Sequence, residues 1–292
     1  MKDKKYRLTL LDFFLLALLL GFILFVVYRL TYSLNYKWNW SIIPTYLVRI
    51  DDETGRWTAN VLLQGLFTTI KLSIWGMIIA AILGLIMGMA RTSSKLLLNL
   101  ISRTYVELIR NTPPLVLVFI FYFFVSDQIL PALGIERYIR SLSEEQQGIV
   151  SFLAVPKELF IPFLSGTITI GIFQGAYITE IVRAGIQSIS IGQWEASSAL
   201  GLNYWQQLRL IILPQALRRM LPPLANEFIN TIKYSSIVSI ISIQELTFQG
   251  MQVMSSTQVT IEVWLTITFM YLVLCLSLSI VVHKMENHFS PS

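Results

Sequence analysis

A lysine and two asparagines stand in an apolar stretch of the C-terminal third of the chain. Asn226, Asn230 and Lys233 are spaced i, i+4 and i+7, which puts them on one face of a helix. Lys233 follows Pro223 by about 15 Å of helix, which places it near the middle of a bilayer if the stretch spans one. An ammonium group at this depth can bind the carboxylate of a substrate, or it can pair with a fixed glutamate and hold helices together. The sequence leaves both readings open.

Gln174 and Glu180 are polar residues of another apolar stretch. Glu180 has Arg183 at i+3, which favours an ion pair within one helix, and the sharper reading is a role near the inner gate of a transport path. Gln174 lies deeper and can hydrogen-bond an amino or carboxylate group. Together with the first three residues they form our predicted substrate pathway: Gln174, Glu180, Asn226, Asn230 and Lys233.

The residue types that catalysis and metal binding need are scarce. Cys275 is the only cysteine, and the two histidines, His283 and His288, both belong to the C-terminal tail. An intrachain disulfide and a cysteine-based metal site are therefore excluded. The sequence has no GxxxxGK[ST] phosphate loop, no HExxH and no GxSxG motif. It predicts no catalytic residue, no metal site and no cofactor bound by this chain.

Membrane-spanning helices must position these polar residues. Of the 292 residues, 54% are apolar and 13% are charged, against about 25% charged in a soluble domain, and the mean hydropathy is +0.64. These values predict an all-α membrane protein with six transmembrane helices. Six apolar stretches offer the roughly 20 residues that a spanning helix needs, at 8–30, 62–90, 113–130, 161–184, 223–243 and 262–282.

The distribution of lysine and arginine predicts the orientation. The larger share of the 22 basic residues falls on the cytoplasmic side when both termini are placed inside. The net charge of +5 and the pI near 9.3 follow from this bias, so they do not indicate nucleic acid as a partner. We expect Lys71 to snorkel from the outer edge of its span, and Glu245 and Glu262 to lie at the outer interface.

Two outer segments are long. Residues 31–60 are rich in tryptophan and tyrosine, which is typical of the headgroup region of a membrane. Residues 127–160 carry mixed charges and a short predicted helix over 144–152. This second segment is either a solvated connection or a surface for a partner.

Small residues recur in two of the predicted spans. Ala80, Gly84 and Gly88 follow each other at four-residue spacing, and so do Gly171 and Gly175. This spacing lets two helices approach closely, and it predicts tight packing between spans.

The loop over residues 185–221 is too long for a turn and too apolar for a flexible linker. A short helix would place Trp194, Ala196, Ala199 and Leu200 on one face, with Gly201 at its C-terminal cap in a left-handed conformation. A second helix over 203–213 would align apolar side chains on one side, and Pro214 would bend the chain back. The side chains in question are Leu202, Trp205, Leu208, Ile211 and Ile212. The pattern predicts a cytoplasmic helix–glycine–helix knob with an apolar docking face, and the alternative is a loop lying on the lipid surface.

The spacing of this loop resembles the EAA loop of the permease subunits of ABC importers. The matching residues are Glu195, Ala196, Gly201, Ile211, Leu213 and Pro214, with Ser197 where the motif has alanine. Residues 107–115, 175–185, 213–217 and 230–236 resemble the branch of the family that takes up polar amino acids. The resemblance covers roughly residues 60–285.

The resemblance implies a type I, MetI-like core of five helices plus an extra N-terminal helix. It divides the chain into an anchor helix and outer segment (1–60), a permease domain (61–285) and a tail (286–292). In the permease domain, 127–160 is an outer insertion and 185–221 is the loop that couples to an ATPase.

The implied function is import of polar amino acids such as glutamate, glutamine or aspartate, or a broad range, by alternating access across a bacterial inner membrane. The implied partners are an ABC ATPase dimer that holds ATP and magnesium, a second permease chain, a solute-binding protein and lipid. A stand-alone secondary carrier or channel is the alternative, but it does not explain the loop.

Overall fold

The computed structural model describes residues 9–32, 36–52 and 55–289. The chain forms two compact units, Met1–Trp40 and Ser41–Ser292. The first unit contains one long helix, α1 (Leu10–Tyr32). Its apolar side chains are exposed all around, and its window of 20 residues, Leu10–Arg29, has a mean hydropathy of 2.9. A helix that is apolar on every side is suited to lipid, so the first predicted span is confirmed.

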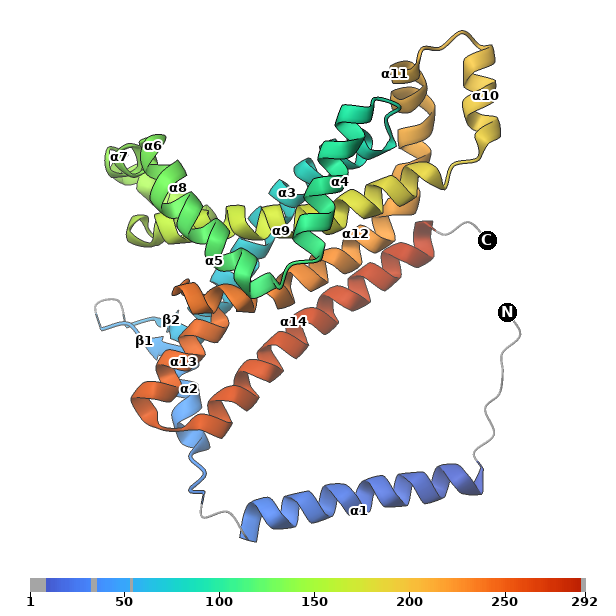
Figure 1. Ribbon diagram of the computed structural model, residues 1–292. Coiled ribbons are helices and arrows are strands. Elements are labelled where there is room, and N and C mark those ends of the chain that lie inside the picture. Colours follow the sequence, from blue (N-terminus) through green and yellow to red (C-terminus); the bar gives the residue numbers. More distant parts are fainter. Residues whose placement is uncertain (1–8, 33–35, 53–54, 290–292) are drawn as a thin grey trace. The chain divides into compact units, whose positions relative to one another are not determined.

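The second unit is a bundle of helices (Figure 1). Its elements in chain order are the 3-10 turn η1 (Trp40–Ile42), α2 (Ile43–Leu47), β1 (Val48–Ile50), β2 (Trp57–Ala59), α3 (Val61–Thr92), α4 (Leu96–Arg110), α5 (Pro114–Phe124), the π-helical η2 (Val125–Ile129), α6 (Leu130–Ala132), α7 (Ile135–Arg140), α8 (Glu144–Leu153), η3 (Lys157–Leu159), α9 (Phe160–Gln187), α10 (Ile191–Ala199), α11 (Tyr204–Gln206), the π-helical η4 (Gln207–Ile212), α12 (Leu213–Ser235), η5 (Ser236–Ile241), α13 (Leu246–Thr257) and α14 (Thr260–Phe289).

A short antiparallel hairpin departs from the all-α prediction. β1 and β2 pair with Arg49 opposite Thr58. Gly55, at φ +63°, supplies the left-handed residue of the turn. The hairpin precedes α3, whose first turn is capped by Asn60 through its side-chain oxygen.

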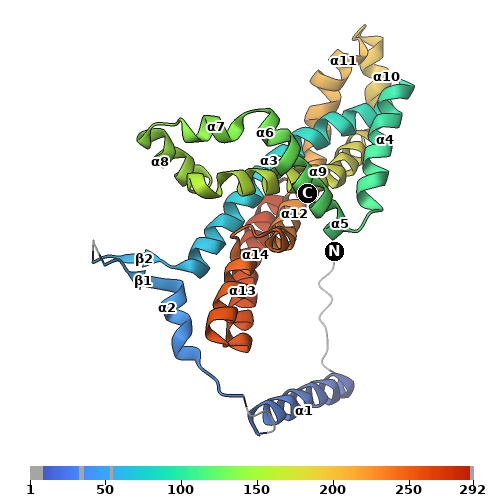
Figure 2. The same ribbon diagram turned by 60° about the vertical axis from the view of Figure 1, so that its left-hand side comes forward.

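The predicted close packing of two spans is confirmed between α3 and α9, which cross in Figures 1 and 2. A Cβ added to Gly84 would lie 2.4 Å from Ile178 Cγ2, and one added to Gly171 would lie 2.5 Å from Ile79 Cγ2. These contacts leave no room for any larger residue, because ordinary carbon contacts begin near 3.5 Å. The glycines therefore set the distance between α3 and α9.

Five of the six predicted spans coincide with helices long and apolar enough to cross a membrane: Leu10–Arg29, Val61–Thr92, Pro114–Ala132, Lys157–Gln187 and Thr260–Lys284. The remaining stretch, 223–243, begins within α12, so the helix does not start at Pro223 as predicted. α12 also carries Arg218, Arg219, Glu227 and Lys233, which lower its hydropathy. A polar face suits a helix that lies inside the bundle and borders a water-filled path.

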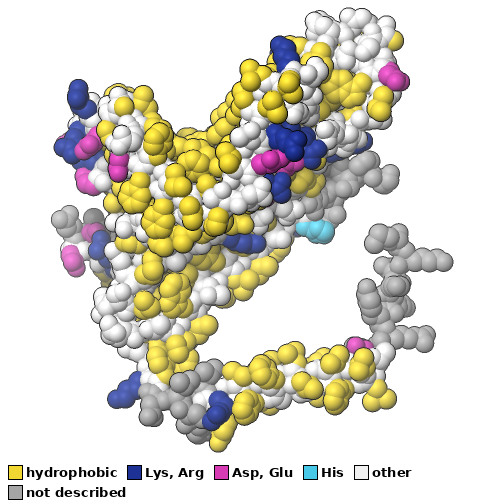
Figure 3. Space-filling view, viewed as in Figure 1, with side chains coloured by type: hydrophobic (Ala, Val, Ile, Leu, Met, Phe, Trp, Pro, Cys, Tyr) yellow, Lys and Arg dark blue, Asp and Glu magenta, His cyan; other side chains and the backbone are white. Residues whose placement is uncertain are grey.

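Two helices of more than ten residues, α4 and α13, have no counterpart in the prediction. α4 is strongly amphipathic and runs back from the end of α3, and α13 follows the 223–243 stretch. The helix expected over 144–152 is confirmed as α8, which Ser143 and Gln146 begin with a reciprocal capping box. Figure 3 shows charged side chains gathered over α6–α8 and around α4, with hydrophobic side chains covering the surface between them.

Candidate functional site

The helix–glycine–helix knob forms one end of the second unit, where α10 and α11 project beyond α9 and α12 (Figure 1). We call residues 188–207 the α10 loop. Gly201 has φ +74°, which confirms the predicted left-handed cap, and a Cβ there would meet nothing within 4 Å. The glycine is therefore required for its backbone conformation and not for space.

Hydrogen bonds make the α10 loop a fixed structure. The Gln207 side chain donates to Ser198 Oγ at 3.0 Å and to the Leu202 carbonyl at 2.7 Å. Gln215 of α12 donates to Gln193 of α10 at 3.1 Å. The chain therefore reverses through a turn whose buried amide connects α10 to the helix that leads into α12.

The exposed face of α10 differs in part from the predicted docking face. Glu195, Ala196 and Leu200 are exposed, Leu200 at 77%. Trp194 is half-buried instead, because it stacks on Tyr204 with ring centroids 5.8 Å apart. Of the predicted face, Ala196, Ala199 and Leu200 are thus exposed and Trp194 is not, and Glu195 adds a carboxylate.

The second half of the knob needs two corrections. Pro214 does not bend the chain back, since η4 runs directly into α12 with the proline in the first turn. Proline has no backbone N–H to donate, and the π-helical turn η4 before Pro214 accommodates this, so the helix continues into α12. Trp205 is 58% exposed, while Leu208 and Ile212 are fully buried. Ile211 and Leu213 pack against the same buried cluster, so they anchor the knob on the helix bundle.

Glu180 forms the predicted ion pair and a second one. Its carboxylate lies 2.8 Å from Arg183 Nε and 3.1 Å from Arg91 Nε, and Arg91 belongs to the last turn of α3. The Glu180 side chain is 19% exposed. The residue therefore joins α3 to α9 near the knob.

A polar cluster lies between α9 and α12. Gln174 is fully buried and donates to Thr231 Oγ1 at 2.9 Å, while its own Oε1 is buried without a hydrogen-bond partner. Asn230 donates to the Glu227 carboxylate at 3.3 Å. The structure thus brings together two predicted residues, Gln174 and Asn230, with two that sequence reasoning missed, Glu227 and Thr231. Glu227 lies at i+3 from Asn230, which was the available signal.

Arg110, at the end of α4, is a residue that the sequence analysis did not single out. Its guanidinium lies 5.4 Å from the centroid of the Tyr177 ring of α9. Tyr177 interacts electrostatically with both Arg110 and Glu227. Tyr177 therefore lies close to both a cation and a carboxylate.

Lys233 and Asn226 are exposed on α12, and among the described residues no carboxylate forms an ion pair with Lys233. Asn230, the middle residue of the i, i+4, i+7 spacing, reaches the polar cluster through Glu227. Lys71 Nζ donates to the Ser151 carbonyl at the end of α8, at 3.0 Å. Glu245 and Glu262 are fully buried within the protein.

Glu245 caps α13 and connects three helices. Its carboxylate accepts hydrogen bonds from Phe248 N and Tyr271 Oη, both at 2.8 Å, and from Thr69 Oγ1 at 3.4 Å. Among the described residues, no group of three or more histidine, cysteine or acidic side chains is arranged to hold a metal ion.

Membrane-length helices around a polar cluster, with a rigid knob at one end, define a membrane transport subunit. Residues 80–290 match the family model described as "Binding-protein-dependent transport system inner membrane component". The chain is 34% identical over 237 residues to the glutamine transport system permease protein GlnP of Escherichia coli (strain K12), a match that covers 81% of this chain and 96% of GlnP.

Two further similarities agree. The chain is 31% identical to the glutamate/aspartate import permease protein GltK of Escherichia coli O6:H1, over 86% of this chain and 98% of GltK. The crystal structure of an amino acid ABC transporter with histidines matches with a TM-score of 0.61 and 31% identity, over 78% of this chain and 94% of that chain.

The chain therefore belongs to the family of binding-protein-dependent transport system inner membrane components. It is a permease subunit of an ABC importer, a translocation component and not a catalyst, with the MetI-like core and an extra N-terminal helix.

Proposed function

We propose that this permease moves polar amino acids into the cytoplasm by alternating access, driven by ATP that a separate ATPase subunit hydrolyses. Glutamine, glutamate and aspartate are the first candidate substrates, because similar permeases carry these names. The observation that carries the proposal is the rigid α10 loop joined through Gln207 to the helix that bears the polar cluster.

The polar cluster is suited to an amino-acid zwitterion. The free Oε1 of Gln174 and the Glu227 carboxylate accept hydrogen bonds, as a substrate ammonium group requires. The exposed Arg110 guanidinium can pair with a carboxylate in bidentate geometry. Asn230 lies beside Glu227, whereas Asn226 and Lys233, on the exposed face of α12, would meet substrate or a second permease chain.

The α10 loop supplies the coupling. Glu195, Ala196 and Gly201 would lie at the centre of the contact with an ATPase groove, and Ile211, Leu213 and Pro214 would hold the loop on the bundle. Closure of an ATPase dimer would then move α10, and through it α12. Glu180 would keep α3 and α9 together near this inner end through its two arginine pairs.

This proposal places the α10 loop and both termini in the cytoplasm, and the segment 127–160 outside. The partners are an ATPase dimer with ATP and magnesium, a second permease chain, an extracytoplasmic binding protein and bacterial inner-membrane lipid.

Uptake by proteoliposomes tests the proposal. The complex is reconstituted with its ATPase and binding protein, and labelled amino acids are screened with ATP inside. We expect ATP-dependent accumulation of one or a few polar amino acids, and a large loss with Glu227→Gln but not with Glu107→Gln, whose exposed carboxylate only pairs with Arg103. Uptake that an ion gradient drives without ATP would replace the proposal by the secondary carrier.

A further inference from the structure

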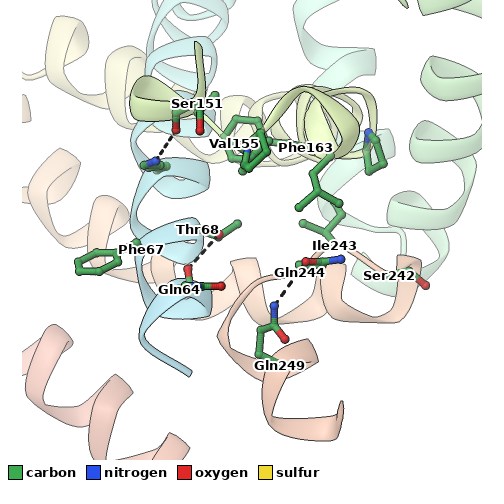
Figure 4. Close-up of a pocket in the computed structure, with 15 residues that line it drawn as sticks. Gln64, Phe67, Thr68, Ser151, Val155, Phe163, Ser242, Ile243, Gln244 and Gln249 are labelled. Carbon is green, nitrogen blue, oxygen red and sulfur yellow. Dashed lines mark hydrogen bonds between the residues drawn. The ribbon is translucent and has the colours of Figure 1, made fainter. Parts of the chain in front are cut away.

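A second polar space lies apart from the cluster around Gln174. A cavity of about 320 Å³ is bounded by α3, by the link from α8 to α9 and by the link from η5 to α13 (Figure 4). Figure 4 shows Ser151 and Val155 on one side of it and Gln244 and Gln249 on the opposite side, with Gln64 and Thr68 beside them. Its volume lies at the lower end of the range for small-molecule sites, about 300–1,000 Å³.

Lys71 gives this cavity a positive charge. Its ammonium donates one hydrogen bond, to the Ser151 carbonyl at 3.0 Å, and has two donors left. Within the described parts of the chain, no carboxylate forms an ion pair with Lys71. A half-buried cation in a membrane protein is expected to have an anionic complement.

Gln249 gives the cavity an unmet acceptor. Its side chain lines the cavity and the residue is only 5% exposed. Its amide nitrogen reaches Gln244 Oε1 at 3.5 Å, the limit of a hydrogen bond, while its Oε1 is buried without a partner. A buried acceptor left in this state costs free energy that a ligand's N–H groups would recover.

The backbone beside the cavity is strained. Ser242, which lines it, has φ +61°, a left-handed conformation that serine rarely adopts. Strain of this kind persists where surrounding structure fixes it, and it concentrates at ligand sites. It is an observation independent of the charge of Lys71 and the free oxygen of Gln249.

The C-terminal part of the insertion at 127–160 forms one wall of the cavity. α8 ends over it, and two side chains of α3 hold that end: Lys71 on the Ser151 carbonyl and Trp75 Nε1 on the Leu153 carbonyl, both at 3.0 Å. These bonds satisfy carbonyl groups that a helix C-terminus leaves free. Lys71 therefore both supplies the positive charge of the cavity and holds the end of α8 against it.

We propose that this cavity is a second amino-acid binding site, on the extracytoplasmic half of the permease, in which Lys71 binds the α-carboxylate and Gln249 accepts from the α-ammonium group. The inference rests on the proposed function for the orientation and for the class of ligand. It assigns to the insertion the role of closing a site through which the substrate passes before it reaches the cluster at Gln174.

Equilibrium binding to the reconstituted permease–ATPase complex, without binding protein and without ATP, tests this site. The probe is radiolabelled L-glutamine, or the amino acid that the uptake screen selects, and the competitor is the same amino acid with its α-carboxylate converted to an amide. Lys71→Met is compared with Lys71→Arg, which keeps the charge, and with Lys157→Met, which removes an exposed lysine that does not line the cavity.

We expect wild type, Lys71→Arg and Lys157→Met to prefer the free carboxylate over its amide, and Lys71→Met to lose at least about tenfold of that preference at the second site. Wild type, Lys71→Arg and Lys157→Met should each saturate at two ligands per permease chain. Loss of the Lys71–Ser151 hydrogen bond alone would weaken binding of the amino acid and of its amide equally, so it would not change the preference between them.

A wild-type complex that takes up amino acids but binds one ligand per chain, with the same preference in Lys71→Met, would overturn the second site and leave the proposed function intact. A complex that takes up no amino acid would overturn the proposed function itself.

Discussion

Gly84 sets the distance between α3 and α9, and its replacement by alanine gives a prediction that the coordinates quantify. The new Cβ would lie 2.4 Å from Ile178 Cγ2, 2.6 Å from Ile178 Cβ and 3.1 Å from its carbonyl carbon. Two of these atoms are fixed to the backbone, so a side-chain rotation cannot relieve the contact. The helices must separate by about 1 Å to restore ordinary carbon contacts near 3.5 Å.

We expect Gly84→Ala to lower the free energy of unfolding by about 1–3 kcal/mol, the usual cost of an overpacked core. In a protein of this size that corresponds to about 2–4 °C of melting temperature per kcal/mol. Cys275 is the only cysteine and is partly buried in α14, so its reaction with a thiol-reactive dye during heating reports unfolding of the purified chain.

Gly148→Ala is the matched control. Gly148 also lies inside a helix, α8, but a Cβ there meets nothing within 4 Å. Alanine should therefore leave the melting temperature unchanged or raise it, since glycine costs a helix about 0.5–1 kcal/mol. Equal melting temperatures for Gly84→Ala and wild type would refute the packing argument.

Three further outcomes follow from single contacts. Gly201→Asp should abolish most ATP-driven uptake, because it adds a charge to the exposed face of the α10 loop, while an immunoblot should show unchanged membrane insertion. Gly201→Asn should keep most of the uptake, because asparagine tolerates a positive φ. Wild-type uptake by Gly201→Asp would refute the coupling role. Glu180→Gln should lower stability by about 1–2 kcal/mol in the dye assay, because it leaves the partly buried Arg91 and Arg183 without their carboxylate. Glu107→Gln should change the melting temperature much less, because its pair with Arg103 is exposed to solvent, and equal effects would contradict the burial argument. Glu245→Ala should lower the free energy of unfolding by about 2 kcal/mol or more, and Glu245→Gln should lower it clearly less, because glutamine keeps an acceptor for Tyr271. The reverse order of melting temperatures would show that the cap is unimportant.

The features that sequence predicts well are those that depend on local chemistry. Apolar runs of sufficient length became α1, α3 and α14, because lipid selects for length and composition. Gly201 was predictable since few other residues adopt its backbone conformation, and α8 began where a serine and a glutamine could cap it.

What escaped prediction depends on neighbours distant in sequence. Asn226 and Lys233 are exposed on α12, and only the packing of α12 against α9 decides that Thr231 meets Gln174. The contact of Arg110 with Tyr177 was not predictable, because it depends on how α4 packs against α9. Pro214 was read as a bend since the π-helical turn before it leaves no sequence signal.

ATP hydrolysis by the purified complex in lipid, measured with the binding protein and with each polar amino acid in turn, tests the central claim most directly. The account predicts that one or a few amino acids stimulate hydrolysis, and that Gly201→Asp removes the stimulation while the ATPase still co-purifies. Hydrolysis that no amino acid changes, or a chain that purifies without any ATPase and transports on an ion gradient alone, would contradict it.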